Sequence, residues 1–312
     1  MLYYGRKEDK LACQGKHRIR GDTQNTPCLS NEAMYLATDS NGAEIALLID
    51  QHRLLTGYMG GLFPQGIDTA SLQRVLDLAC GPGDWVQDVA FERQDIDVIG
   101  IDSSRSLITH ARTMASVQDL DNAFFEVMDI HKPLDFEDDS FDFIQARLLT
   151  SVLSPAEWSG LLTECWRILR PGGILRLVEA EWPQTNSPAV QHLGRMVNQA
   201  QRQVGRSYSP DGRYLDALVP WLRDARFKGV CNQLYEIPLG PPGFVGMHPL
   251  MELVRMELYL MEPALLRLGV TTQEEFATLL SAMELDANNY TFDGRPDFLG
   301  AQLIAEAWGE KR

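Results

Sequence analysis

The sequence predicts an α/β protein whose core is a doubly wound, mostly parallel β-sheet. Between residues 74 and 182, short apolar runs alternate with longer segments of helical periodicity, and short connections join them. This alternation is typical of βαβ units, in which helices cover both faces of parallel strands. A glycine-rich turn, CGPGDW at residues 80–85, follows the first run. Because ligands of such sheets bind beyond the carboxyl ends of the strands, this turn is the first candidate for a binding site.

The chain before the sheet divides into two parts. Residues 1–28 are polar and without periodicity, which predicts a poorly ordered arm. From Ser30 to Leu55 apolar residues fall at helical spacing, and the loop GYMGGLFPQG at residues 57–66 ends that pattern. We therefore expect residues 1–70 to form an arm and a helical cap, and residues 71–312 to form the main domain.

Seven apolar runs, most of them rich in β-branched residues, are predicted to be strands. Helical segments connect most of them, and Asp84 is the expected N-cap of the first of these helices. A helical insertion, residues 240–293, precedes the last strand and has the turns GPPG and TFDGRP at its two ends. The predicted strands are residues 74–79, 96–102, 123–130, 141–147, 173–182, 230–239 and 298–308.

Composition argues against several classes of protein. Lys and Arg total 28 against 43 Asp and Glu, a net charge of −15, whereas nucleic acids and anionic membranes require a basic surface. The five cysteines are scattered without a C-x-x-C pair, which favours a reducing compartment and neither disulfides nor a bound metal. No apolar run reaches the roughly 18 residues of a membrane span, and no secretory signal is recognisable. We expect a cytoplasmic protein without nucleic-acid, membrane or metal partners.

The glycine turn and the end of the second strand together indicate a nucleoside cofactor. Gly81 and Gly83 allow a ligand to approach the backbone, and Asp102 follows Gly83 by nineteen residues, where a carboxylate can accept both ribose hydroxyls. The dinucleotide pattern requires a third glycine where this chain has Val86. No Lys or Arg lies between the neighbouring acids Asp77, Asp84 and Asp88 in the sequence. A cationic nucleoside therefore fits better than a pyrophosphate, and S-adenosylmethionine (SAM) meets that description.

Longer segments resemble a known family. LDLACGPGDW, VIGIDSSRSLITHAR, FFEVMDIHKPLDFEDDSFDFIQAR and ECWRILRPGGILRLVE, which together run from residue 76 to residue 179, resemble class I (Rossmann-like) SAM-dependent methyltransferases of the small-molecule type. FLGAQLIAEAWGEK at residues 298–311 is similar to the last strand of that family, which is antiparallel. The resemblance implies a seven-stranded sheet with SAM as the cofactor. One departure is Ala79, where the family often has glycine.

The resemblance also implies roles for individual residues. The turn from Asp77 to Gly83 would line the methionine part of SAM, and Asp102 would hold the ribose with Ser103 beside it. The Asp129 side chain would accept the amine of the adenine. The implied cofactor-binding residues are Asp77, Ala79, Gly81, Gly83, Asp102, Ser103, Met128, Asp129, Ile130, Gln145 and Arg147, the last two at the border of the methyl-transfer site.

The methyl acceptor is less constrained. The insertion 240–293 carries a methionine-rich segment, which predicts a lid over a small apolar metabolite of the kind found in secondary metabolism. Oxygen, nitrogen and carbon acceptors all stay open, as does a homodimer. Alternatives are a methyltransferase acting on a macromolecule and a SAM-binding regulatory or scaffold protein without turnover. Candidate proton acceptors are Glu181 and Glu179 at the end of the fifth strand, His248 in the lid, and His131 and His52.

Replacing Asp102 by alanine tests the position of the ribose. The variant loses charge-assisted hydrogen bonds, so SAM should bind about ten- to hundred-fold more weakly in calorimetry. An unchanged dissociation constant would show that the second strand does not end at the ribose.

Overall fold

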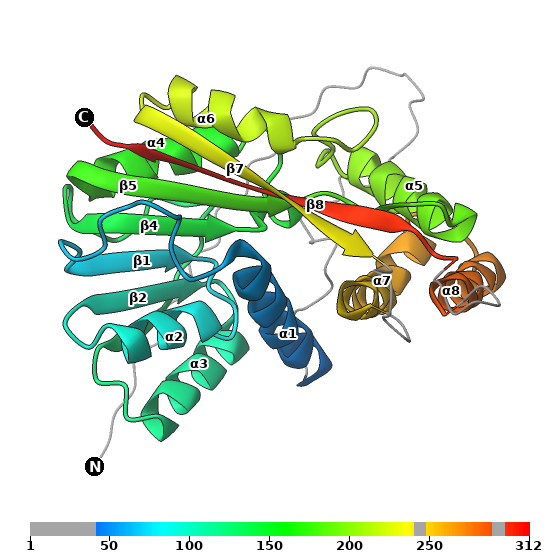
Figure 1. The fold of residues 1–312 in the computed structure, drawn as a ribbon, viewed down its shortest axis with the longest axis horizontal. Coiled ribbons are helices and arrows are strands. Elements are labelled where there is room, and N and C mark those ends of the chain that lie inside the picture. Colours follow the sequence, from blue (N-terminus) through cyan, green and yellow to red (C-terminus); the bar gives the residue numbers. More distant parts are fainter. Residues whose placement is uncertain (1–41, 240–247, 289–296) are drawn as a thin grey trace, which may run out of the picture. The chain divides into compact units, whose positions relative to one another are not determined.

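The computed structural model describes residues 42–239, 248–288 and 297–312 (Figure 1). The strands are β1 (Arg74–Leu78), β2 (Asp97–Asp102), β3 (Ala123–Val127), β4 (Phe141–Arg147), β5 (Leu169–Ala180), β6 (Gln184–Thr185), β7 (Lys228–Leu239) and β8 (Gly300–Glu310). The helices are α1 (Gly42–Met59), α2 (Asp84–Glu92), α3 (Arg105–Val117), α4 (Trp158–Ile168), α5 (Pro188–Gln203), α6 (Leu218–Asp224), α7 (Pro249–Arg267) and α8 (Gln273–Ala287), with 3₁₀ turns η1 (Leu149–Ser151) and η2 (Leu215–Ala217).

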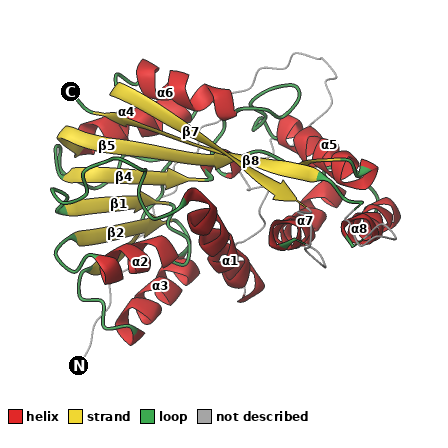
Figure 2. Cartoon of the chain, viewed as in Figure 1, coloured by secondary structure: helices red, strands yellow, loops and turns green. Residues whose placement is uncertain are grey.

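The strands form one mixed sheet, as the sequence predicts (Figure 2). Its order is β3-β2-β1-β4-β5-β8-β6, and β7 also pairs with β8. The first five strands in this order are parallel, whereas β8 runs antiparallel to β5, β6 and β7. All seven predicted strands are present and the last is antiparallel; the two-residue β6 is an addition that the sequence did not predict. The strand order reverses between β1 and β4, so the carboxyl ends of these two strands flank the expected ligand crevice.

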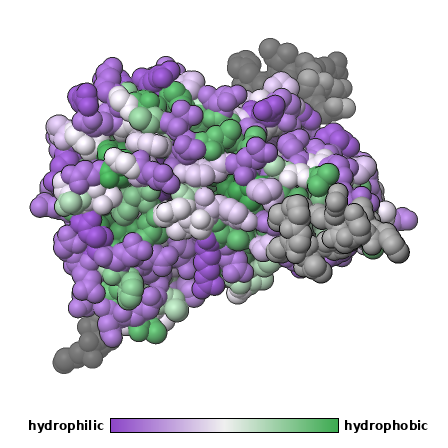
Figure 3. All heavy atoms as spheres, in the orientation of Figure 1, coloured by the Kyte–Doolittle hydropathy of each residue, from purple (hydrophilic) through white to green (hydrophobic). Residues whose placement is uncertain are grey.

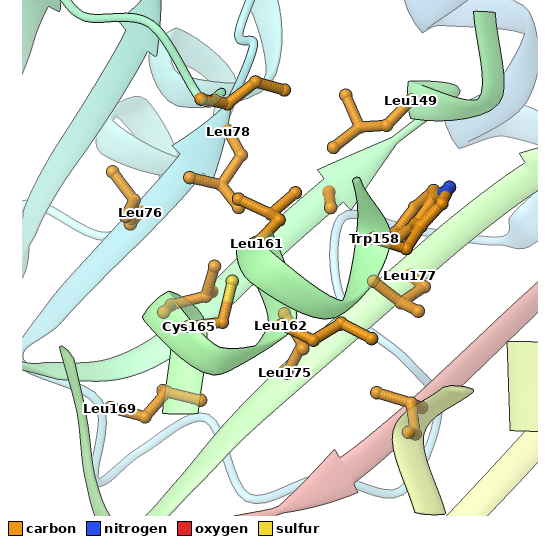
Figure 4. Packing of buried hydrophobic residues seen from close by; sticks show 14 of the residues in the cluster. Leu76, Leu78, Leu149, Trp158, Leu161, Leu162, Cys165, Leu169, Leu175 and Leu177 are labelled. Carbon is orange, nitrogen blue, oxygen red and sulfur yellow. The ribbon is translucent and has the colours of Figure 1, made fainter. Parts of the chain in front are cut away.

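Both faces of the parallel strands are buried, because alternate side chains enter two separate hydrophobic clusters. On one face, Val75, Val98 and Phe143 pack with residues of α2 and α3. On the other face, leucines of β1 and β5 pack against α4, whose Trp158 is fully buried (Figure 4). This burial on two faces explains why the strands are continuous apolar runs in the sequence.

A third hydrophobic cluster lies beyond the carboxyl ends of the parallel strands. Helices α1, α5, α7 and α8 contribute to it, and Figure 1 shows these helices at that end of the sheet. The predicted helical cap is therefore present as α1, and the predicted insertion contains α7 and α8. Its proposed hinges, the turns at 240–243 and 291–296, lie outside the described residues, as do residues 1–41. Among the described residues, no helix is long and apolar enough to cross a membrane, and the face in Figure 3 is largely hydrophilic.

The turn between β1 and α2 depends on its glycines and contains one strained residue. Gly83 has φ +88°, and a Cβ atom there would lie 2.5 Å from Cε1 of Phe125. Ala79 also has positive φ, at 51°, which costs an alanine about 1 kcal/mol and explains why glycine suits this position. The predicted N-cap was wrong: Gly83 is the N-cap of α2, and Asp84 is its first helical residue, where the carboxylate faces the positive end of the helix dipole.

A polar row crosses the interior of the sheet. Asp77, Gln145 and Arg176 are register partners on β1, β4 and β5, and each is at most 2% exposed. Arg176 donates to Oε1 of Gln145 at 2.7 Å and to Oε2 of Glu306 on β8 at 2.8 Å. It also donates to the carbonyl of Leu62 at 2.7 Å, beyond the end of α1. An unpaired charge in this position would be costly, so Arg176 must keep these partners. Its bond to Leu62 therefore ties the chain that follows α1 to the sheet.

Removing the charge of Glu306 should destabilise the fold. Glu306→Gln leaves Arg176 without an ionic partner, so the free energy of unfolding in urea should fall by about 3–5 kcal/mol. Glu310→Gln is the matched control, because Glu310 lies on the same strand and pairs with Arg312 at 2.8 Å in a more exposed position. That control should change stability by less than about 1 kcal/mol. Equal effects of the two substitutions would show that the buried pair has no special weight.

Candidate active site

One cavity of about 550 Å³ lies at the carboxyl ends of the parallel strands. Its volume falls within the usual range for small-ligand sites. The glycine turn and the end of β2 form one wall, α1 a second, and α7 a third; α5 and residues 206–214 complete it. Of the candidate site residues predicted from the sequence, the cavity is lined by His52, Asp77, Ala79, Gly81, Asp102, Ser103, Arg147 and Glu181.

Two carboxylates of the glycine-turn wall differ in their hydrogen bonding. Asp102 accepts the backbone N–H of Gly81 at 3.0 Å on one oxygen and that of Ser104 at 2.8 Å on the other. Burial raises the pKa of Asp102, and these two hydrogen bonds oppose the rise. Asp77, in contrast, has a buried oxygen, Oδ2, without any hydrogen-bond partner. Burial raises the pKa of Asp77 to about 6, although Arg147 acts to lower it.

Arg147 contradicts one premise of the sequence argument. No basic residue lies between the acids of the turn in the sequence, but the fold places Arg147 where the charges of Asp77, Asp84 and Asp88 all act on it. Burial lowers the pKa of Arg147, and these carboxylates oppose that shift. Arg147 therefore neutralises part of the negative charge of these three carboxylates. The remaining negative charge is still an environment that suits a cation and not a pyrophosphate.

His52 on α1 holds Arg147 in place. Its Nδ1 lies 3.0 Å from Nη1 of Arg147, and its Nε2 lies 2.8 Å from Oδ2 of Asp88. A guanidinium can only donate, so Nδ1 must accept and the proton must be on Nε2, directed at Asp88. With both ring nitrogens engaged, His52 acts as a positioning residue in this structure and not as a proton acceptor.

The residues expected around the adenine do not line the cavity. The backbone N–H of Met128 donates to the carbonyl of Asp102 at 3.0 Å, which places the end of β3 beside the predicted ribose site. Asp129 accepts from His131 and pairs with Lys132 at 3.0 Å. Burial acts to raise the pKa of Asp129, but these interactions outweigh it and lower the pKa to about 2. Met128, Asp129 and Ile130 as adenine ligands therefore stay a prediction.

The candidate proton acceptors occupy different surroundings. Glu181 lines the cavity, but one of its oxygens accepts from the N–H groups of Tyr214 and Leu215. Glu179 lies behind the cavity wall, where burial raises its pKa to about 8 and Thr150 donates to its carboxylate. His248 lies outside the lining, its Nε2 is hydrogen-bonded to the hydroxyl of Tyr58 at 3.1 Å, and burial lowers its pKa.

Two of the predicted cofactor-binding residues, Gly83 and Gln145, also lie outside the cavity lining.

Glu257 on α7 was missed by the sequence analysis. It lines the cavity, and its Oε1 accepts a hydrogen bond from Nε2 of Gln51 on α1 at 2.9 Å. Burial raises the pKa of Glu257 to about 7. The other residues of α7 that line the cavity, among them Leu253, Val254 and Leu260, are apolar. A carboxylate among apolar residues on a helix was a possible signal in the sequence, but α7 carries other acids, and only the fold shows which one faces the cavity.

Comparison with known proteins agrees with the geometry. Residues 75–173 match the family model described as "Methyltransferase domain". A "Secondary metabolism regulator laeA" of Monascus pilosus is 29% identical over 175 residues, which are 54% of this chain and 44% of that protein. A "Demethylmenaquinone methyltransferase" of Lactiplantibacillus plantarum is 33% identical over 126 residues, 40% of this chain and 51% of that one. The matched segments thus span about half the length of these relatives. The YcgJ protein of Bacillus subtilis has a similar structure, with TM-score 0.48 and 19% identity, covering 78% of this chain and 95% of that chain.

The sheet order and the cavity at its switch point define a nucleotide-cofactor-binding α/β domain. The segment that matches the methyltransferase-domain model, residues 75–173, contains the glycine turn and the ends of β2 and β4, and the cofactor is SAM. The residues present fit that cofactor. The unpartnered Oδ2 of Asp77 is a buried acceptor at the turn, as a cationic ligand requires, and the carboxylate of Asp102 lines the same wall.

Cofactor affinity should depend on the ionisation of Asp77. A cationic ligand binds the carboxylate and not the neutral acid, so affinity should rise with pH through about 6, the pKa of Asp77 in the free protein. Calorimetry should show SAM binding about tenfold more tightly at pH 7 than at pH 5. Asp77→Asn should flatten this dependence, whereas Asp97→Asn, at the exposed start of β2, should leave it intact. A full pH dependence in Asp77→Asn would mean that another group binds the cation.

Proposed function

We propose that this protein transfers a methyl group from SAM to a small molecule bound in the cavity between α1, α5 and α7. SAM supplies the methyl group as an activated sulfonium. The observation that carries the proposal is the continuity of the cavity, which extends from Asp77 and Asp102 at the strand ends to Glu257 on α7. A cofactor at the turn and an acceptor against α7 would therefore share one cavity.

The chain's own residues provide what such a transfer requires. Asp77 and Asp102 would hold the cofactor, and Arg147 would stay fixed beside them through His52. The helices at the strand ends exclude water, which keeps the reacting atoms aligned. Leu253, Val254 and Leu260 of α7 offer an apolar surface, which supports an acceptor with an apolar part.

Among the candidate proton acceptors, the surroundings of Glu257 fit the role best. Its carboxylate faces the cavity and titrates near neutrality, which is where a general base works most efficiently. Glu181 remains a second candidate because it lines the same cavity, but backbone N–H groups hold one of its oxygens. Glu179 and His248 lie outside the lining and would need a rearrangement to reach an acceptor.

A SAM-binding regulator without turnover is the alternative, and the relative named as a regulator of secondary metabolism gives it a specific basis. Such a protein needs no polar group on the acceptor side of the cavity. The presence of Glu257 and Gln51 there favours turnover. A cavity of about 550 Å³, the size of a small-ligand site, also favours a small acceptor over a macromolecule.

Methyl-labelled SAM distinguishes these possibilities. The protein is incubated with it and with a cell extract separated by ultrafiltration into small molecules and macromolecules. We expect label in the small-molecule fraction, and much less of it with the Asp77→Asn or Asp102→Ala variants when the SAM concentration is below their dissociation constants. Label in the macromolecular fraction alone would contradict a small acceptor. SAM binding without any transfer would support the regulator.

The rate of methylation should follow the ionisation of Glu257. The base form appears as pH rises through about 7, so the rate should rise over that range. Glu257→Gln should lower the rate by about 100- to 10,000-fold with SAM affinity unchanged. Gln51→Leu removes a hydrogen bond that lowers the pKa of Glu257, so it should move the rise to higher pH. Near-normal turnover by Glu257→Gln would transfer the role to Glu181.

A further inference from the structure

Arg206 is a buried cation without an ionic partner. Its residue is 7% exposed, and it lines the cavity. The single hydrogen bond of its guanidinium is a long one, from Nη1 to the carbonyl of Ser151 at 3.3 Å. Within the part of the chain that the structure describes, no carboxylate lies within 4.0 Å of it. Arginine is rarely buried unless it is paired, because the charge loses its hydration without compensation.

The other charged groups of this wall are already engaged. Arg213 lies 3.9 Å from Glu181, and its side chain is 66% exposed. Asp211 accepts from the hydroxyl of Ser209 at 2.8 Å. Glu157 feels the charge of Arg206, but its carboxylate accepts the N–H of Ser154 at 2.7 Å. Among the described residues, Arg206 thus has no carboxylate in direct contact, although the chain's net charge is −15.

The segment that carries Arg206 is held in place. The hydroxyl of Tyr208 donates to the carbonyl of Leu153 at 2.6 Å and accepts from the indole of Trp158 at 2.6 Å. The N–H of Arg206 donates to the carbonyl of Gln201 at 2.8 Å, at the end of α5. The guanidinium therefore stands on a fixed backbone and is preorganised for a ligand.

Its position assigns Arg206 to the acceptor and not to the cofactor. The cofactor residues Gly81 and Asp102 follow β1 and β2. Arg206 is bonded to Ser151, which follows β4, on the other side of β1 from β2 in the sheet order. The two sets of residues line the same cavity from different sides of the switch point.

We propose that Arg206 binds a carboxylate group of the methyl acceptor. The acceptor is then amphipathic, with an apolar body against Leu253 and Val254 of α7 and a carboxylate at Arg206. Arg206 shares the cavity lining with neutral amides such as that of Gln201, and a guanidinium can bind a carboxylate through two parallel hydrogen bonds. This inference rests on the proposed function in taking the cavity as the acceptor site.

Octanoate and octan-1-ol are suitable probes, because they share an apolar chain and differ in the charged group. Calorimetry in the presence of saturating S-adenosylhomocysteine should show octanoate binding about tenfold more tightly than octan-1-ol. Arg206→Gln should remove that difference by weakening octanoate alone, and Arg206→Lys should retain part of it. Arg195→Gln is the control, since Arg195 lines the same cavity with an exposed side chain and should leave the preference intact.

Stability gives a second readout. If Arg206 awaits a ligand, its removal relieves an uncompensated charge, so Arg206→Gln should not lower the melting temperature of the ligand-free protein. A lower melting temperature with an unchanged octanoate preference would show a structural role and overturn the proposal. Octanoate binding no tighter than octan-1-ol in the unaltered protein would also overturn it. Binding of S-adenosylhomocysteine in that case would leave the proposed function standing.

Discussion

The charge of Arg176 inside the sheet requires acceptors, and those acceptors come from β4, from β8 and from the chain that follows α1. Glu306 on β8 neutralises the charge of Arg176. Arg176 also donates to the carbonyl of Leu62, beyond α1, and to Oε1 of Gln145 on β4, so both groups are held in place. Tyr235 of β7 donates to the other oxygen of Glu306 at 2.6 Å. With its oxygen bound to Arg176, Gln145 has only its NH₂ group to offer toward its register partner Asp77. The buried ion pair therefore fixes Gln145 beside Asp77, and among the described residues neither Nε2 of Gln145 nor Oδ2 of Asp77 has a hydrogen-bond partner.

Function then depends on where charge is left uncompensated. Around the turn, the charges of Asp77, Asp84 and Asp88 all act on Arg147, and three carboxylates beside one arginine leave a wall that suits a cationic cofactor. On the opposite side of the switch point, Arg206 has no ionic partner among the described residues, and Glu257 is a carboxylate held near its neutral form on an apolar wall. Uncompensated charges lower stability, and proteins retain them where a ligand supplies the partner.

The sequence predicted the sheet well because each strand is buried on two faces and leaves a continuous apolar run, as in Val75 to Leu78. It predicted Asp77, Asp102 and Arg147 as site residues because strand ends are recognisable from the same runs. Contacts between residues distant in the chain leave no such pattern. The proximity of Arg147 to the turn, the pairing of Gln51 with Glu257, and the isolation of Arg206 all depend on how helices pack beyond the sheet. The capping error at Asp84 was local: Gly83 adopts a left-handed conformation that no side-chain pattern announces.

A crystal structure with S-adenosylhomocysteine would test the central claim most directly, because that ligand carries the same ammonium and ribose as the cofactor. The account predicts that the ammonium donates to Oδ2 of Asp77, the buried oxygen that lacks a partner in the free protein, and that the ribose hydroxyls reach Asp102. The bonds from Arg176 to Gln145 and Glu306 should be unchanged. A complex in which Oδ2 of Asp77 still has no partner, or in which the ligand lies outside this cavity, would contradict the account.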